Sequence, residues 1–188
     1  MRLFLLNLVI FCFAGIAQAS EPPTWNIDQS KSALTFTVVV NGQTVKGRFP
    51  GVGAQIRFDP TNLAQSSVKA TIDTTGIKTF DATRDAMLLK PAWFNVLDFP
   101  HATFESTSFT AAGPNRFVCN GKLAIKGTSR DISLPFTLTI TGNTAVMSGS
   151  AALRRLDFKI GEGPDYQTES PVSLSVNVMV NIRATRTR

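Results

Sequence analysis

A regular alternation of apolar and polar residues constrains the fold of this chain more than any other feature. Between residues 132 and 140, every second residue is Ile, Leu or Phe, and the residues between them are Ser, Pro or Thr. Between residues 172 and 182, Val, Leu and Ile alternate in the same way with Ser, Asn and Met. Because successive side chains of a β-strand point to opposite faces of the sheet, each stretch predicts a strand with one apolar and one solvated face.

Shorter stretches with a similar pattern predict further strands along the chain. Turn sequences such as Asn41-Gly42 and Gly142-Asn143 separate them. One-sided strands are typical of antiparallel sheets, since parallel strands are apolar on both faces. Together with the two long stretches, the sequence predicts eight or nine antiparallel strands, the others at residues 34–40, 44–49, 55–59, 68–73, 103–109, 117–126 and 144–153.

One short helix interrupts this series. It is predicted over residues 82–90, with Asp81 as its N-cap and Pro91 preventing its continuation. So many long one-sided strands favour a sheet closed on itself, because closure removes exposed edges. The predicted fold class is therefore all-β, a single closed antiparallel barrel of about eight strands with one short helix. A barrel of this size either fills with side chains or holds one small ligand.

The first 19 of the 188 residues have the pattern of a signal peptide. Arg2 gives a positive start, an apolar run follows, and Ala17-Gln18-Ala19 has the small-x-small form of a cleavage site. We expect cleavage before Ser20, one domain over residues 20–188, and a soluble protein in the periplasm. Only Cys119 of the two cysteines then remains, so no internal disulfide is expected.

Residues suited to catalysis are scarce. The single histidine, His101, is the only base available to a Cys119 thiol or to a serine triad. We find no dinucleotide or phosphate loop and too few Cys and His residues for a usual zinc site, so an enzyme, a cofactor and a metal are not expected. Most aromatic residues lie on the apolar faces of the predicted strands and do not form stacking platforms interleaved with basic residues, which speaks against nucleic acid. The basic C-terminus, with Arg183 and Arg186, is either solvated surface or a region that attracts anionic head groups.

The order of several short motifs is more specific than any one of them. Trp25-Asn26-Ile27-Asp28 is followed by Val45-Lys46-Gly47-Arg48-Phe49, then by Arg84-Asp85, Trp93-Phe94 and Phe99-Pro100, and finally by residues 121–128 and 155–161. From Trp25 to Ala184 the chain resembles the YceI-like family of exported lipid-binding proteins. The chain departs from the family at Lys31 and Ala86, where the family often has histidine.

The resemblance implies a lipocalin-like barrel with an elongated cavity for a polyisoprenoid or a similar long-chain amphiphile, isoprenoid or fatty. Some relatives accompany membrane b-type cytochromes or quinone pathways, so a quinone-like ligand and a membrane-surface or cytochrome partner are further expectations. Arg84, Asp85 and Arg155 are interpreted as head-group positions, with structural salt bridges as an equal alternative. The apolar residues predicted to contact the lipid are Phe36, Val38, Phe49, Phe58, Leu88, Leu89, Trp93, Phe94, Phe99, Phe104, Leu123, Phe136, Leu138, Phe158, Val176 and Val178.

Two other functions stay open at this point. One is a barrel that acts as an interaction or stress-protection module, supporting a membrane redox partner; it would have an exposed apolar patch and no continuous cavity. The other, weaker one is an enzyme acting on isoprenoid or quinone substrates.

Overall fold

The computed structural model describes residues 20–187, so the predicted signal peptide lies outside the described residues. All nine predicted strands are present, and a tenth precedes them. The strands are β1 (Thr24–Ile27), β2 (Ala33–Val40), β3 (Gln43–Arg48), β4 (Val52–Arg57), β5 (Ser67–Asp73), β6 (His101–Gly113), β7 (Arg116–Ile125), β8 (Thr128–Thr141), β9 (Thr144–Arg154) and β10 (Val172–Arg186).

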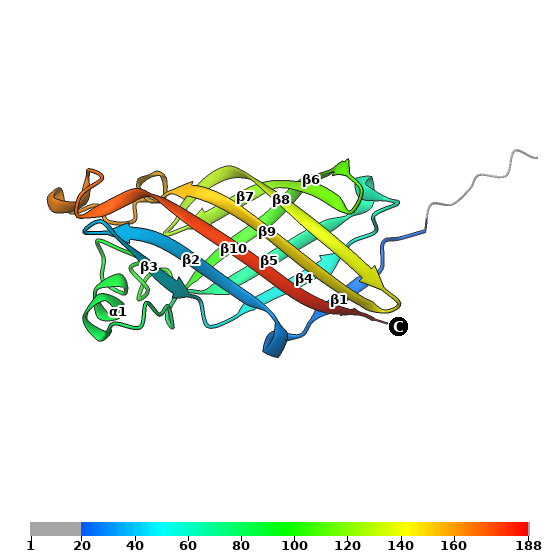
Figure 1. Ribbon diagram of the computed structural model, residues 1–188, viewed down its shortest axis with the longest axis horizontal. Helices are drawn as coiled ribbons and strands as arrows, with labels where there is room; N and C mark the ends of the chain where they lie inside the picture. The colour runs from blue at the N-terminus through cyan, green and yellow to red at the C-terminus, as the bar shows by residue number, and fades with distance from the viewer. Residues whose placement is uncertain (1–19, 188) are drawn as a thin grey trace, which may run out of the picture.

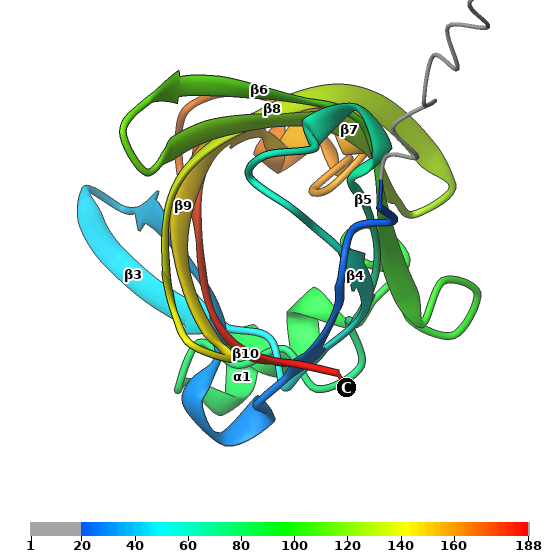
Figure 2. The same ribbon diagram turned by 90° about the vertical axis from the view of Figure 1, so that its right-hand side faces the viewer.

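Eight of these strands form a closed antiparallel barrel, which confirms the predicted fold class (Figures 1 and 2). Their order around the ring is β1-β4-β5-β6-β7-β8-β9-β10, and β10 closes the ring by pairing with β1. Trp25 lies opposite both Arg186 of β10 and Ile56 of β4. The four-residue strand β1 was too short to be predicted, yet it joins the two sides of the barrel.

The hairpin of β2 and β3 extends the wall along the edge of β10 that faces away from β9, the same edge that pairs with β1. β2 pairs with the first part of β10, from Val172 to Asn181, whereas β1 pairs with the last part. Asn41 and Gly42 both have positive φ, of 49° and 76°, as the tight turn of a two-residue hairpin requires. β3 ends in an isolated bridge between Arg48 and Lys78, which ties the hairpin to the segment that leads into the helix.

The helix α1 (Ala82–Leu88) begins where the sequence predicts. Asp81 accepts a hydrogen bond from the Arg84 backbone N–H, which confirms its role as N-cap. The helix ends two residues earlier than predicted, because the chain turns at Lys90 and Trp93, whose N–H groups bond to Met87 and Lys90. Four short 3₁₀ turns were not predicted: η1 (Gln29–Lys31), η2 (Leu63–Gln65), η3 (Arg155–Phe158) and η4 (Pro164–Tyr166).

The barrel is long and its two ends differ (Figure 1). At the α1 end lie α1, the β2–β3 turn and the residues between β9 and β10. At the other end, the β1 end, lie β1, the β8–β9 turn and the C-terminus. Each end has its own core: the cluster at the α1 end centres on Phe36, Trp93 and Phe158, and the cluster at the β1 end centres on Trp25, Phe58 and Phe136.

Candidate functional site

The inward faces of the strands enclose a cavity of about 240 Å³. Strand β8 shows how the sequence builds it: Ile132, Leu134, Phe136, Leu138 and Ile140 all line the cavity, whereas the residues between them are exposed. The same alternation is found on β10, where every second residue lines the cavity: Val178, Val180, Ile182 and Ala184. All 31 lining residues are apolar.

The cavity extends along most of the barrel. On β8 the lining residues run from Ile132 to Ile140, which is roughly 26 Å along a strand that rises about 3.3 Å per residue. Barrel strands tilt by about 35–45° from the axis, so this corresponds to roughly 20 Å along the barrel. The site is therefore long and narrow, the shape that suits a hydrocarbon tail.

Four phenylalanines, which we call the phenylalanine cluster, occupy the β1-end half of the barrel. The ring of Phe58 lies 5.2 Å from Phe109, 5.5 Å from Phe117 and 6.0 Å from Phe136, in each case edge to face. Such contacts stabilise aromatic pairs beyond the burial of their area. The indole N–H of Trp25 donates to the Phe58 carbonyl at 2.9 Å. Figure 2, which looks in from this end, shows the β4–β5 connection folding across part of the rim.

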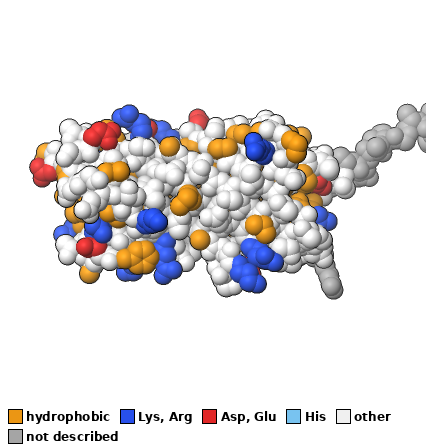
Figure 3. All heavy atoms as spheres, in the orientation of Figure 1, with side chains coloured by type: hydrophobic (Ala, Val, Ile, Leu, Met, Phe, Trp, Pro, Cys, Tyr) orange, Lys and Arg blue, Asp and Glu red, His pale blue; other side chains and the backbone are white. Residues whose placement is uncertain are grey.

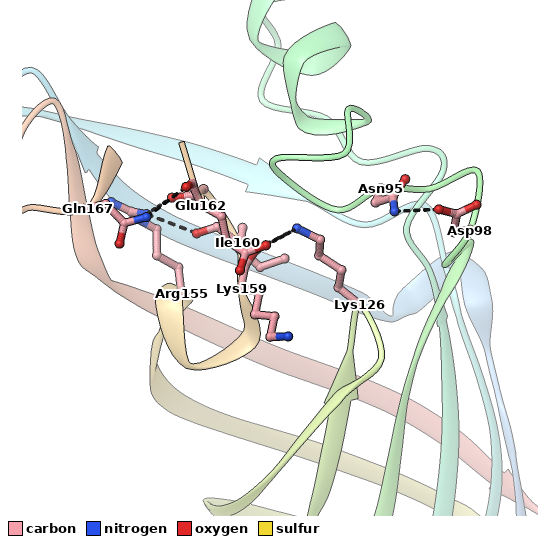
Figure 4. Close-up of polar contacts among 9 residues, drawn as sticks. Asn95, Asp98, Lys126, Arg155, Lys159, Ile160, Glu162 and Gln167 are labelled. Atoms are coloured by element: carbon pink, nitrogen blue, oxygen red, sulfur yellow. Dashed lines mark hydrogen bonds and ion pairs between the residues drawn. The ribbon is translucent and has the colours of Figure 1, made fainter. Parts of the chain in front are cut away.

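Two segments outside the sheet close the α1 end, and we call them together the cap: residues 89–99 and residues 155–171. The Ala92 carbonyl accepts from the backbone N–H groups of Gly161 and Glu162, at 2.8 and 3.0 Å. The rings of Trp93 and Tyr166 lie 5.1 Å apart. Lys126 at the β7–β8 turn donates to the Lys159 carbonyl and to Glu162, which holds the second segment to the barrel (Figure 4).

Of the sixteen apolar residues predicted to contact lipid, half line the cavity. These are Phe49, Phe58, Phe94, Phe104, Leu123, Phe136, Leu138 and Val178. Seven others pack into or against the core at the α1 end: Phe36, Val38, Leu88, Leu89, Trp93, Phe158 and Val176. Phe99 is 36% exposed and belongs to neither group. Many further lining residues, such as Leu134 and Ile182, carry the same period-two signal and could have been found from it.

The predicted head-group residues Arg84 and Asp85 lie in a network at the start of α1. Asp85 is buried, and its Oδ1 accepts from the backbone N–H and the hydroxyl of Thr79, at 2.6 and 2.7 Å. Arg84 Nε donates to the same hydroxyl at 3.0 Å, and Lys78 Nζ lies 3.6 Å from Asp85 Oδ2. Burial alone would raise the pKa of Asp85, but the Thr79 hydrogen bonds and Lys78 hold the pKa below its usual value. The network fastens the segment before the helix.

Arg155, the third predicted head-group residue, is 3% exposed and donates to six backbone carbonyls. The acceptors are Ser173, Ile160, Gly161, Tyr166, Thr168 and Val172. A guanidinium has five N–H donors, so these carbonyls engage all of them. Gly161, with φ of 78°, leaves the space that the guanidinium occupies, since a Cβ there would lie 2.6 Å from it. Arg155 thus organises the second segment of the cap (Figure 4).

The residues considered for catalysis are far apart. Cys119 lines the cavity opposite Phe109, whereas His101 begins β6, eight residues away along that strand. At about 3.3 Å per residue this is roughly 26 Å, too far for a thiol and its base. Burial raises the pKa of the Cys119 thiol to about 12. Within residues 20–187, no group of three or more His, Cys, Asp or Glu residues could hold a metal ion.

Two observations concern the outside of the molecule. On the face seen in Figure 3, apolar side chains are separated from one another by polar surface, with lysines and arginines among them. No helix of the described part of the chain is long and apolar enough to cross a membrane.

Residues 25–185 match the family described as the YceI-like domain. The chain belongs to the YceI-like family. Among curated relatives of this YceI-like chain, a UPF0312 protein from Pseudomonas paraeruginosa is 35% identical over 138 residues, which cover 69% of this chain and 71% of the relative.

Solved structures agree with this assignment. BcnA from Burkholderia cenocepacia has a TM-score of 0.81 and 29% identity, over 85% of this chain and all of that protein. A polyisoprenoid binding domain from Saccharophagus degradans has a TM-score of 0.69 and 13% identity, over 88% of this chain and 99% of that domain, a likeness that concerns the fold alone.

Proposed function

We propose that this YceI-like protein is a carrier that holds a polyisoprenoid or a similar long-chain amphiphile in its barrel, in the periplasm and without catalysis. The observation that carries the proposal is the elongated cavity whose described lining is wholly apolar. Small-ligand sites are mostly apolar and concave, and each buried methylene contributes about 0.8 kcal/mol to binding. The name of the domain from Saccharophagus degradans, a polyisoprenoid binding domain, supports the same ligand class.

The apolar wall of the cavity offers few contacts that would distinguish one kind of hydrocarbon tail from another. Without hydrogen-bond donors in the wall, isoprenoid, fatty and quinone-bearing tails of similar length gain similar burial free energy. We therefore propose that the protein accepts several such amphiphiles. The alternative of an interaction module requires a barrel without a continuous cavity, so the cavity favours the carrier.

Two neighbouring alanines of β9 give a matched test. Ala151 lines the cavity and Ala152 is exposed on the outer face. Ala151→Phe places a ring in the space intended for the tail, whereas Ala152→Phe adds the same ring outside. Native mass spectrometry of the proteins purified without added lipid should show a hydrophobic adduct on the wild type and on Ala152→Phe, and its loss on Ala151→Phe. A wild type that carries no adduct and takes up no added prenyl lipid would refute the proposal.

A further inference from the structure

The two ends of the cavity are closed by different kinds of structure. At the β1 end, Phe58, Phe109, Phe117 and Phe136 are each at most 9% exposed, and their rings contact one another. Phe109, Phe117 and Phe136 lie on the strands β6, β7 and β8. Phe58 directly follows β4, and its carbonyl accepts from Trp25 of β1, a residue that pairs with both β10 and β4. Opening this end requires breaking packed rings and strand pairing together.

At the α1 end, two of the residues that reach the cavity come from connections, beside strand residues such as Ile125 and Leu153. Phe49 follows β3 and Phe94 belongs to the cap; both are half-buried, and their ring centres lie 6.1 Å apart. The cap segments are joined to each other by the two hydrogen bonds to the Ala92 carbonyl and the Trp93–Tyr166 contact. These contacts can separate without breaking any ladder of the barrel.

The α1 end also offers a place for the polar part of an amphiphile. Within the wall, the described lining is apolar, and burying a polar head there without partners is unfavourable by several kcal/mol. At the α1 end, Lys126 directly follows Ile125, which lines the cavity, and its ammonium group sits among polar atoms of the cap (Figure 4).

We propose that the tail of the ligand enters from the α1 end and stops against the phenylalanine cluster, with the head group at the cap and Phe58 setting the longest tail accepted. This inference rests on the proposed function and adds to it the orientation of the ligand and a residue that determines its length.

The chain contains two tryptophans, one at each end, which makes the orientation measurable. Trp25 lines the cavity at the β1 end, and Trp93 lies in the cap. Bromine quenches tryptophan fluorescence only when it is close to the indole. The ligands are two isomers of one long-chain fatty acid, brominated either at the terminal carbon or next to the carboxyl group. The proteins are Trp93→Phe, which keeps Trp25 as its reporter, and Trp25→Phe, which keeps Trp93.

The expected result is a crossed pattern. The terminally brominated acid quenches Trp25 more than its isomer does, and the acid brominated near the carboxyl group quenches Trp93 more. The reverse pattern, equal quenching by both isomers, or a complex in native mass spectrometry without quenching would each overturn the orientation. If neither acid nor any prenyl lipid binds to the wild type, the proposed function itself fails, so the two failures are distinguishable.

Phe58→Leu tests the length limit. Each methylene newly buried in the shortened cluster should raise the affinity for a longer acid about fourfold relative to the wild type. Phe158→Leu is the control, because Phe158 is buried at the α1 end but does not line the cavity. Thermal melting checks folding, and Phe109→Leu replaces Phe58→Leu if that variant does not fold. An unchanged length profile in the folded cluster variant, or an equal shift in the control, would show that the cluster does not set the length.

Discussion

Replacing Arg155 with methionine should strongly destabilise the protein. The side chain is 3% exposed, and removal of its guanidinium takes away the hydrogen bonds that it donates to six backbone carbonyls. An unsatisfied buried polar group costs about 1–3 kcal/mol, and water can reach part of this outer segment, so not every carbonyl carries that cost. We expect a net loss of about 3–5 kcal/mol in the free energy of unfolding, because two or three unsatisfied carbonyls at that cost already reach this sum.

Thermal unfolding measures this loss, and the preceding residue provides the control. For a protein of this size, 1 kcal/mol shifts the melting temperature by about 2–4 °C, so Arg155→Met should melt roughly 6–20 °C lower than the wild type. Arg154 is exposed and lies 3.9 Å from Asp157, a surface pair that contributes little. Arg154→Met should therefore stay within about 0.5 kcal/mol of the wild type.

The same pair of variants separates a structural role from a head-group role. If Arg155 holds the cap and does not touch the ligand, Arg155→Met at low temperature should bind anionic and uncharged long-chain lipids in the same ratio as the wild type. A variant that melts like the wild type, but no longer prefers an anionic lipid that the wild type prefers, would contradict the structural reading.

Two further predictions concern ionisation. The pKa of Asp85 is lower in the folded protein than in the unfolded chain, so its contribution to stability is present above about pH 4 and is lost as the pH falls through the folded value. Asp85→Asn should cost about 1–3 kcal/mol at neutral pH and flatten the acid side of the stability curve in urea titrations, whereas an unchanged curve would exclude this role. Burial raises the pKa of Cys119 from 9.0 to about 12, so at pH 8 its thiolate is about a thousandfold rarer than in the unfolded chain. Iodoacetamide should alkylate the thiol far more slowly in native protein than in urea, and equal rates would contradict its burial.

The residues of the cavity wall could be predicted from the sequence, because every second residue of a strand points inward. Once β8 is placed, the alternation from Ile132 to Ile140 selects the inward residues without any knowledge of their partners. The alternation does not show where along a strand the cavity ends. On β10, Val176 and Val178 point to the same face in one continuous register with β2, and both pack against the core at the α1 end, but only Val178 lines the cavity.

The end of the barrel was harder to predict than its wall, because residues that close an end and residues that line a wall have the same composition. Phe36 and Phe49 both belong to the predicted lipid-contacting residues, and their rings lie 5.6 Å apart. Phe36 packs over Gly47 of the neighbouring strand, where a Cβ would lie 2.2 Å from its ring, and Phe49 lines the cavity. The Asn41-Gly42 turn predicts the pairing of β2 with β3, but it does not show which of the two rings lines the cavity.

The roles of Arg155 and Asp85 could not be predicted from the sequence for a different reason. Arg155 donates to backbone carbonyls, which every residue carries, so its partners leave no pattern of side chains to detect. Asp85 is bound chiefly by Thr79, a residue without charge. In both cases the sequence identifies a charged residue correctly as special, but a charged residue inside an apolar protein is special for structural reasons as often as for binding.

Asp85 and Arg155 hold the chain at one end of the barrel, outside the lining of the cavity. Asp85 and Arg155 fix connections at the α1 end, where β-strand ladders do not hold the chain, and neither of them lines the cavity. A substitution among the lining residues, such as one at Phe58, therefore changes the volume and length of the cavity and leaves the hydrogen bonds of Asp85 and Arg155 in place. Ligand length and stability should accordingly be separable, with length determined at the phenylalanine cluster and the closed state of the barrel determined at the opposite end.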